Sequence, residues 1–284
     1  MKKRSNLITM LKMLRLVAPL SGYMILAVIM GVVNNIAVSS ITVLAGYALL
    51  QILGFDYGIK LSVFFIAMII CAVIRGVLRY AEQACNHFIA FKLLAHIRDR
   101  VFGALRKLCP AKLEGRNRGE LINIITSDIE LLEVFYAHTI SPICIAFLVE
   151  IIMVLFIGSF HWSLGLLALI AFISVGILLP VIISRRSGTL GDELRSDNGE
   201  LSAYVLESIR GLDETIQYGG GEARLNGLTN KTNALSEKQG RLNKLTGINL
   251  ALANTFILVF DAAMLALCAF LYSRKLIGFD GVLI

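Results

Sequence analysis

Four polar side chains form a single stripe in an otherwise apolar stretch of the sequence. Arg75, Arg79, Glu82 and Asn86 are spaced at i, i+4, i+7 and i+11, which places them on one face of a helix. Charged side chains inside a membrane span usually face a protein interior or a water-filled cavity. The stripe therefore predicts the wall of a polar cavity, whose arginines suit an anionic substrate. The alternative is that the long side chains reach the membrane interface and that Arg79 pairs with Glu82.

Other isolated polar residues occur in the apolar stretches. Asn34 and Asn35 could line the same cavity, or equally hydrogen-bond neighbouring helices. Glu150 and Asp261 are single acids that could pair with an arginine or help bind a cation. No acid–histidine relay is visible, so proton coupling is not expected. The predicted substrate cavity comprises Asn34, Asn35, Arg75, Arg79 and Glu82.

The common signatures of catalysis and metal binding are absent from the sequence. There is no H-E-x-x-H, no nucleophile elbow and no G-x-x-x-x-G-K-[ST] phosphate loop. The five cysteines form no C-x-x-C pair and are expected to act as small apolar residues. We therefore expect no catalytic residue and no metal ligand in this chain, which would not hydrolyse ATP by itself.

Composition and the distribution of basic residues indicate a multi-pass membrane protein. Hydrophobic residues make up 57% of the chain, charged residues 17%, and the mean hydropathy is +0.76. Every Lys and Arg except Lys60, Arg274 and Lys275 falls within 2–15, 75–118 or 185–244. Basic loops near spans mark the cytoplasmic side, so the N-terminus is expected there. The net charge of +7 is better explained by anionic lipid headgroups than by nucleic acid.

The spans follow from this sidedness. Residues 16–55 carry no charge, enough for one long helix or for a hairpin turning at Asn34-Asn35. Because Arg15 and Arg75 both belong inside, one long helix is expected, with the outer turn at 54–60. Residues 1–18 are expected to form an amphipathic helix in the membrane interface. The predicted spans are about 20–53, 61–82, 139–157, 162–183 and 245–273, with a sixth beginning at about 281.

Two amphipathic regions lie between the spans. Residues 83–138 and 184–244 are predicted to form long cytoplasmic helical hairpins, broken at 109–119 and at Gly211 and Gly219. The sequence stops three residues into the expected sixth span, so we expect a truncated chain.

This layout resembles the transmembrane domain of ABC exporters over essentially the whole chain. Residues 110–121, followed by Ser127-Asp128, are similar to the first coupling element of that family. Residues 207–218 are similar to its Glu-x-x-x-Gly-x-x-x-Ile-x-x-Tyr/Phe pattern at the second coupling helix. The resemblance implies an all-α membrane domain. The coupling residues it implies are Ala111, Lys112, Leu113, Glu114, Gly115 and Arg116, and then Gly211, Leu212, Asp213, Glu214, Thr215 and Ile216.

A third set of residues narrows the resemblance. Arg79-Tyr80-x-Glu82, His87, 93–98 and Ile140-Ser-Pro142 look like the CydC-type subunits of the thiol or haem exporter that supports cytochrome bd assembly. The resemblance implies that His87 is a haem-ligand position, because imidazole is a common axial ligand. The alternative is an ordinary histidine at the membrane interface, since no second histidine follows at helical spacing.

The resemblance also implies partners. These are an ABC ATPase domain carrying ATP and Mg²⁺, after residue 284 or on another chain, a second transmembrane half in a homodimer or heterodimer, and the lipid bilayer of the bacterial inner membrane; nucleic acid is not among them. The expected function is ATP-driven export of a thiol compound or haem. A generic lipid, peptide or drug exporter is the alternative, and a polytopic membrane enzyme or receptor is the alternative from another class.

Overall fold

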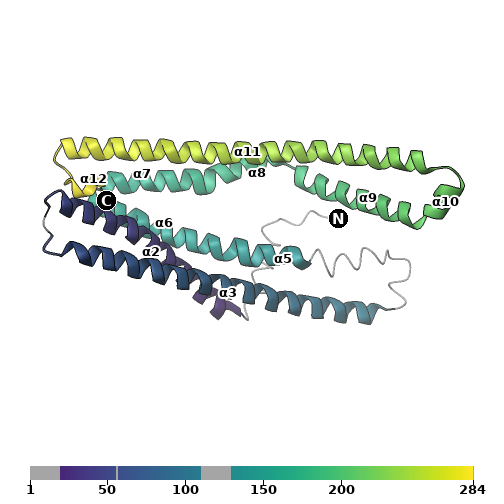
Figure 1. The fold of residues 1–284 in the computed structure, drawn as a ribbon, viewed down its shortest axis with the longest axis horizontal. Coiled ribbons are helices and arrows are strands. Elements are labelled where there is room, and N and C mark those ends of the chain that lie inside the picture. The colour runs from purple at the N-terminus through teal and green to yellow at the C-terminus, as the bar shows by residue number, and fades with distance from the viewer. Residues whose placement is uncertain (1–19, 56, 110–128, 284) are drawn as a thin grey trace. The chain divides into compact units, whose positions relative to one another are not determined.

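The computed structural model describes residues 20–55, 57–109 and 129–283 (Figure 1). These residues form helices joined by short turns, and no strand occurs among them, which confirms the predicted all-α class. The predicted interfacial helix at 1–18 and the first coupling segment, 111–116, lie outside the described residues.

Five helical segments of the described chain are long and apolar enough to cross a membrane. They are Ser21–Ile52, Leu61–Leu108, Tyr136–Phe160, Trp162–Ser187 and Gly221–Ser273. The first is one unbroken helix with no turn at Asn34-Asn35. The part of each helix that lies within the bilayer remains a prediction.

The chain divides into two compact units. The first comprises the described residues up to Phe156 and from Arg274 onward, and the second comprises Ile157–Ser273. The first unit contains α2 (Ser21–Ile52), α3 (Leu61–Leu108), α5 (Ile129–Phe135), the π-helical turn η3 (Tyr136–Ile140), most of α6 (Ser141–Phe160) and α12 (Asp280–Leu283). The second contains α7 (Trp162–Ile173), η4 (Ser174–Leu178), α8 (Leu179–Ser187), α9 (Leu190–Arg210), α10 (Leu212–Gln217) and α11 (Gly221–Ser273).

In the first unit, α2 and α3 form an antiparallel pair joined by a short turn in which Gly54 and Gly58 have positive φ. The buried side chains of Ile89 and Leu93 on α3 pack with Tyr136 of η3. This cluster fixes the start of α6 against the middle of α3, which is where the polar stripe predicted from the sequence ends.

Helix α3 is unusually long, and its end has a local cause. Its 48 residues correspond to about 72 Å at 1.5 Å per residue. Cys109 caps it in an extended conformation, with φ −79° and ψ 144°. The next residue in the sequence is Pro110, and the residue before a proline is disfavoured in the α region. The helix therefore stops where the sequence predicted a break.

Both π-helical turns end shortly before a proline. The turn η3 ends at Ile140, two residues before Pro142, and η4 ends at Leu178, two residues before Pro180. A proline within a helix cannot donate to the carbonyl of residue i−4, and its ring crowds that carbonyl. A widened turn relieves the crowding and rotates the side chains that precede it. In η3 these include Tyr136, Ala137 and His138.

In the second unit, α11 runs beside α7, α8 and α9, and α10 joins α9 to α11 (Figure 1). The start of α7 is capped by His161, whose Nδ1 accepts a hydrogen bond from the backbone N–H of Ser163 at 3.3 Å. Asp261, considered from the sequence as a buried acid, is exposed on α11. The unit thus places the second predicted coupling segment at the end of a two-helix arm, α9 and α11.

Candidate substrate cavity and coupling arm

A cavity of about 440 Å³ lies between α2, α3, η3 and α6 of the first unit. Its wall combines polar groups with small and branched apolar side chains. The lining residues are Asn35, Arg79, Glu82, Gln83, Ala137, His138, Pro142, Ile145, Ala146, Val149 and Glu150. The structure therefore brings together three of the predicted cavity residues, Asn35, Arg79 and Glu82.

Arg79 and Glu82 form an ion pair in the cavity wall. Nη1 of Arg79 lies 3.1 Å from Oε1 and 3.0 Å from Oε2 of Glu82. The Glu82 side chain is only 2% exposed, whereas that of Arg79 is 57% exposed. A buried carboxylate needs such a partner, because an uncompensated charge in an apolar interior is costly. The Arg79–Glu82 pair expected from the sequence forms, and both of its residues line the cavity.

A glycine allows the three helices to approach each other at this point. A Cβ built on Gly31 of α2 would overlap the side chain of Ile145 on α6 and lie 3.3 Å from Cδ of Glu82. The Gly31 carbonyl accepts a hydrogen bond from Nδ2 of Asn35 at 2.8 Å. Gly31 thus sets the distance between α2 and the wall that carries Glu82.

Two predicted cavity residues lie elsewhere. Arg75 is exposed on α3 and is not in the cavity wall, because the stripe follows the helix away from η3 and α6. Asn34 is 6% exposed and also lies outside the wall, because adjacent helical positions point about 100° apart. Asn86, the last residue of the stripe, is 2% exposed. The buried amide oxygens of Asn34 and Asn86 have no hydrogen-bond partner among the described residues.

The sequence did not assign Gln83, His138 or Glu150 to the cavity. Gln83 follows Glu82 directly, whereas Glu150 comes from the middle of α6. His138 reaches the wall from η3, 59 residues beyond Arg79 in the chain. The signal that could have identified His138 is Pro142, since a proline four residues after a polar side chain in a span marks a distorted helical turn.

His87 lies next to this region but not in the cavity wall. Its ring centroid is 5.6 Å from that of His138 and 5.8 Å from that of Phe91. Its Nδ1 is buried, has no hydrogen-bond partner among the described residues, and lies 3.6 Å from Oε1 of Glu133. No second histidine lies at helical spacing from His87 on α3, but the fold brings His138 of η3 next to it. Within the described ranges, no group of three or more His, Cys, Asp or Glu is arranged to hold a metal ion.

A second cavity of the first unit is nearly apolar. Its volume is about 400 Å³, and it lies between α2, α3 and α6. The lining residues are Ile36, Ser39, Ser40, Val43, Leu44, Tyr47, Cys71, Ile152, Met153 and Phe156. Such a surface suits hydrocarbon rather than a charged molecule.

The second predicted coupling segment forms a short helix at the end of the arm. Gly211 precedes α10, and Gly219, with φ of 65°, turns the chain toward α11. The Thr215 hydroxyl donates to the Gly211 carbonyl at 2.6 Å, which fixes the start of α10. Leu212 and Ile216 are 52% and 69% exposed. Asp213 and Glu214 are exposed as well, so this helix presents both apolar and acidic groups.

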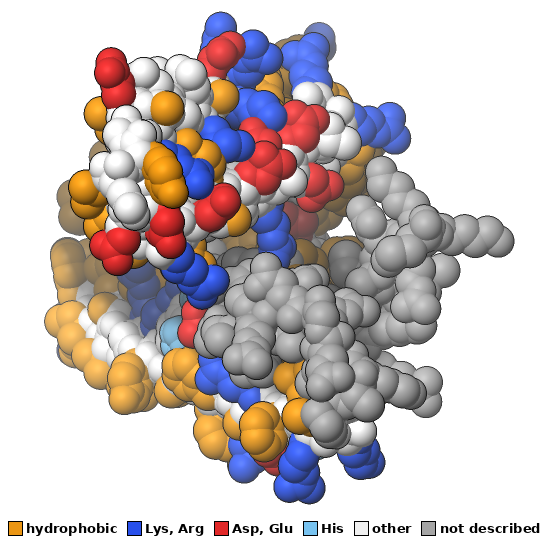
Figure 2. Space-filling model, turned by 90° about the vertical axis from the view of Figure 1, so that its right-hand side faces the viewer, with side chains coloured by type: hydrophobic (Ala, Val, Ile, Leu, Met, Phe, Trp, Pro, Cys, Tyr) orange, Lys and Arg blue, Asp and Glu red, His pale blue; other side chains and the backbone are white. Residues whose placement is uncertain are grey.

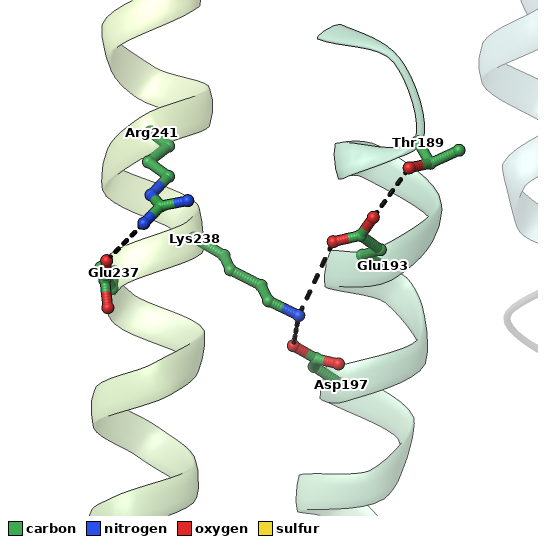
Figure 3. Close-up of polar contacts among 6 residues, drawn as sticks. All are labelled: Thr189, Glu193, Asp197, Glu237, Lys238 and Arg241. Atoms are coloured by element: carbon green, nitrogen blue, oxygen red, sulfur yellow. Dashed lines mark hydrogen bonds and ion pairs between the residues drawn. The ribbon is translucent and has the colours of Figure 1, made fainter.

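Ion pairs with a seven-residue repeat connect the two helices of the arm. Arg224, Lys231 and Lys238 of α11 pair with Glu207, Glu200 and Glu193 of α9 at 3.6, 3.4 and 3.8 Å. Figure 3 shows the end of this ladder, where Nζ of Lys238 also lies 2.7 Å from the Asp197 carboxylate. Thr189 donates to Glu193, and Arg241 pairs with Glu237, both at 2.7 Å. Figure 2, seen from the end at which α10 lies in Figure 1, shows basic and acidic side chains intermixed.

Comparison with known proteins assigns this architecture to a family. The model of the ABC transporter transmembrane region matches residues 7–284. The chain belongs to this family. A probable ABC transporter ATP-binding/permease protein of Haemophilus influenzae is 36% identical over 99% of this chain and 51% of its own length.

More distant relatives have more specific names. The glutathione/L-cysteine transport system protein CydC of Escherichia coli is 27% identical over 64% of this chain and 32% of its own length. An ATP-dependent lipid A-core flippase of Yersinia pestis is 23% identical over 55% of this chain and 26% of its own length. This ABC transporter transmembrane region thus spans about half the length of the first relative and less of the other two.

Proposed function

We propose that this chain is the membrane part of an ATP-driven exporter in the bacterial cytoplasmic membrane, with its N-terminus and helical arms in the cytoplasm. The polar cavity in the first unit carries this proposal. The wall holds an ion pair, two amides, a histidine and a further carboxylate. Ionisable groups within membrane spans commonly mark a substrate or ion pathway. The relatives support it, because they are ATP-binding/permease proteins that continue beyond the region this chain matches.

In the proposed mechanism, α10 docks on an ABC ATPase domain. The exposed Leu212 and Ile216 would enter an apolar groove, and the arm of α9 and α11 would carry the movement to the spans. Ion pairs spaced every seven residues keep the two helices in register, so the arm moves as a rigid lever. A second transmembrane half, identical or different, would supply the opposite wall of the pathway.

The proposed substrate is a thiol compound or haem. The similarity to CydC supports this class, as does the neighbouring pair of His87 and His138. Nδ1 of His87 has no hydrogen-bond partner among the described residues, and Oε1 of Glu133 lies 3.6 Å from it. An imidazole of this kind is a common haem ligand. If haem binds, His87 would hold it and His138 would contact it from η3. The nearly apolar second cavity favours a different substrate, a lipid, and the flippase relative is consistent with that alternative.

Transport by the full-length protein, with any partner half that co-purifies, tests the function. In proteoliposomes, we expect ATP-dependent movement of glutathione or L-cysteine. Changing both Leu212 and Ile216 to Asp should abolish transport and uncouple ATP hydrolysis. Leu225→Asp, at a similarly exposed leucine (61%) on α11, is the matched control. Unaltered transport after the α10 changes would contradict the coupling role.

An optical haem titration tests the haem alternative. A saturable Soret shift should be lost in His87→Ala and weakened in His138→Ala. His96→Ala, at an exposed histidine nine residues further along α3, should leave it unchanged. Equal shifts in all variants would show that haem does not bind at His87.

A further inference from the structure

Glu150 is an uncompensated carboxylate in the wall of the 440 Å³ cavity. It is half-buried in the middle of α6, whose 20 residues contain no other charge. Among the described residues, none forms an ion pair or hydrogen bond with it. A charged side chain at this depth is costly, so a counter-charge is expected.

The cavity itself does not supply that counter-charge. Among the described residues that line the wall, Arg79 is the one arginine or lysine, and it already binds both carboxylate oxygens of Glu82. If Arg79 turned to Glu150, the 2% exposed carboxylate of Glu82 would lose its partner. The two acids of the cavity are therefore different: Glu82 is neutralised by the protein, and Glu150 is open to a ligand.

The groups around Glu150 fit a particular cation. Nδ2 of Asn35 is used by the Gly31 carbonyl, which leaves Oδ1 of Asn35 to accept a hydrogen bond. Gln83 offers a second amide in the same wall. A primary ammonium group has three donors, which these two amides and Glu150 can satisfy. A transition-metal ion fits less well, because the described residues contain no group of three or more His, Cys, Asp or Glu that could hold one.

We propose that Glu150 binds the primary ammonium group of the transported molecule, and that Asn35 and Gln83 accept its remaining hydrogen bonds. The apolar part of the wall, Ile145, Ala146 and Val149, then contacts the carbon skeleton next to that group. The substrate class is a small amine with the dimensions of an amino acid or short peptide, for which 440 Å³ is sufficient. This proposal rests on the proposed function, since it places the cavity on the export pathway.

Binding of matched compounds to the full-length protein tests the proposal. The probes are L-leucinamide and glutathione, each compared with its N-acetyl form, which lacks the ammonium charge. Equilibrium dialysis of wild-type protein should show at least tenfold weaker binding of both N-acetyl compounds. In Glu150→Gln the amines should bind as weakly as their N-acetyl forms. In Glu150→Asp, which keeps the charge, the preference should persist.

The control is Glu130→Gln, at an acid of α5 that is 65% exposed and pairs with Arg98; it should keep the wild-type preference. Failure of the wild-type protein to bind or to prefer the amines overturns the proposal. A preference that survives in Glu150→Gln also overturns it. ATP hydrolysis measured on the same samples separates the two hypotheses, because its absence in the wild type contradicts the exporter function and leaves the binding result intact.

Discussion

Tyr204 of α9 and Gly227 of α11 are in direct contact across the two-helix arm. The Tyr204 hydroxyl donates a hydrogen bond to the Arg224 carbonyl at 3.2 Å, and a Cβ built on Gly227 would overlap that hydroxyl. The same ring lies 5.1 Å from the Arg224 guanidinium and 5.9 Å from Nζ of Lys231. The tyrosine thus sits between two rungs of the ion-pair ladder, and a glycine is required for it to fit.

Gly227→Ala should therefore destabilise the arm. Displacing the ring costs about 1–3 kcal/mol of overpacking, partly offset by the roughly 1 kcal/mol that alanine gains over glycine within a helix. Gly240→Ala on the same helix meets open space and should be stabilising by about 0.5–1 kcal/mol. Thermal unfolding in detergent measures both. If the two alanines shift the midpoint in the same direction, the contact does not determine the helix spacing.

The Lys238–Asp197 pair predicts a dependence on alkaline pH. The hydrogen bond to Asp197 raises the pKa of Lys238 above its usual 10.5, and the charges of Asp197, Glu193 and Glu200 act in the same direction against partial desolvation. Because the folded-state pKa is raised, the stabilisation is complete below pH 10.5 and is lost as the pH rises through the folded value.

The difference in unfolding temperature between the wild type and Lys238→Gln should accordingly be constant near pH 9 and shrink above pH 10.5. High salt should reduce it at pH 9, because the pair lies near the surface. Lys244→Gln, at an exposed lysine of the same helix, is the control. A difference that persists unchanged to pH 12 would show that the charge of Lys238 does not stabilise the arm.

The helices could be predicted from the sequence because apolar spans and helix breaks depend on residues that are close together in the chain. Pro110 ends α3, and the uncharged stretch at 16–55 gives one continuous α2. The stripe on α3 was found because its period is helical. Cavity membership was less predictable, although Arg75 and Asn34 share helices with true lining residues. Arg75 differs from them in its position along α3, and Asn34 differs in the direction of its side chain.

The residues that the sequence missed depend on contacts between distant segments. His138 approaches His87 only because η3 rotates its side chain and α5 packs on α3. Glu150 was recognised as an isolated acid, but nothing local shows that it shares a cavity with Arg79. The requirement for glycine at 31 and 227 is likewise set by a partner helix.

The close contact at Gly31 predicts a second pair of opposite effects. Gly31→Ala should push α6 away from α2 or force Ile145 into another rotamer, which costs about 1–3 kcal/mol. It should also weaken binding in the cavity, because Glu82 lies against the same glycine. Gly22→Ala, in open space near the start of α2, should leave binding unchanged and should be stabilising by at most about 0.5–1 kcal/mol. Ligand binding should be measured for both variants. If Gly22→Ala weakens binding as much as Gly31→Ala does, the close contact at Gly31 is not what shapes the cavity.

A double-mutant cycle tests the ion pair of the cavity wall. Arg79→Gln leaves the 2% exposed Glu82 without its partner and should be destabilising by about 2–3 kcal/mol, below the 3–5 kcal/mol of a fully buried pair, because Arg79 is 57% exposed. Glu82→Gln should cost less, since the arginine can turn toward water. Adding Glu82→Gln to Arg79→Gln should recover most of the loss, because no buried charge remains. Additive effects in thermal unfolding would mean that the two side chains do not stabilise each other.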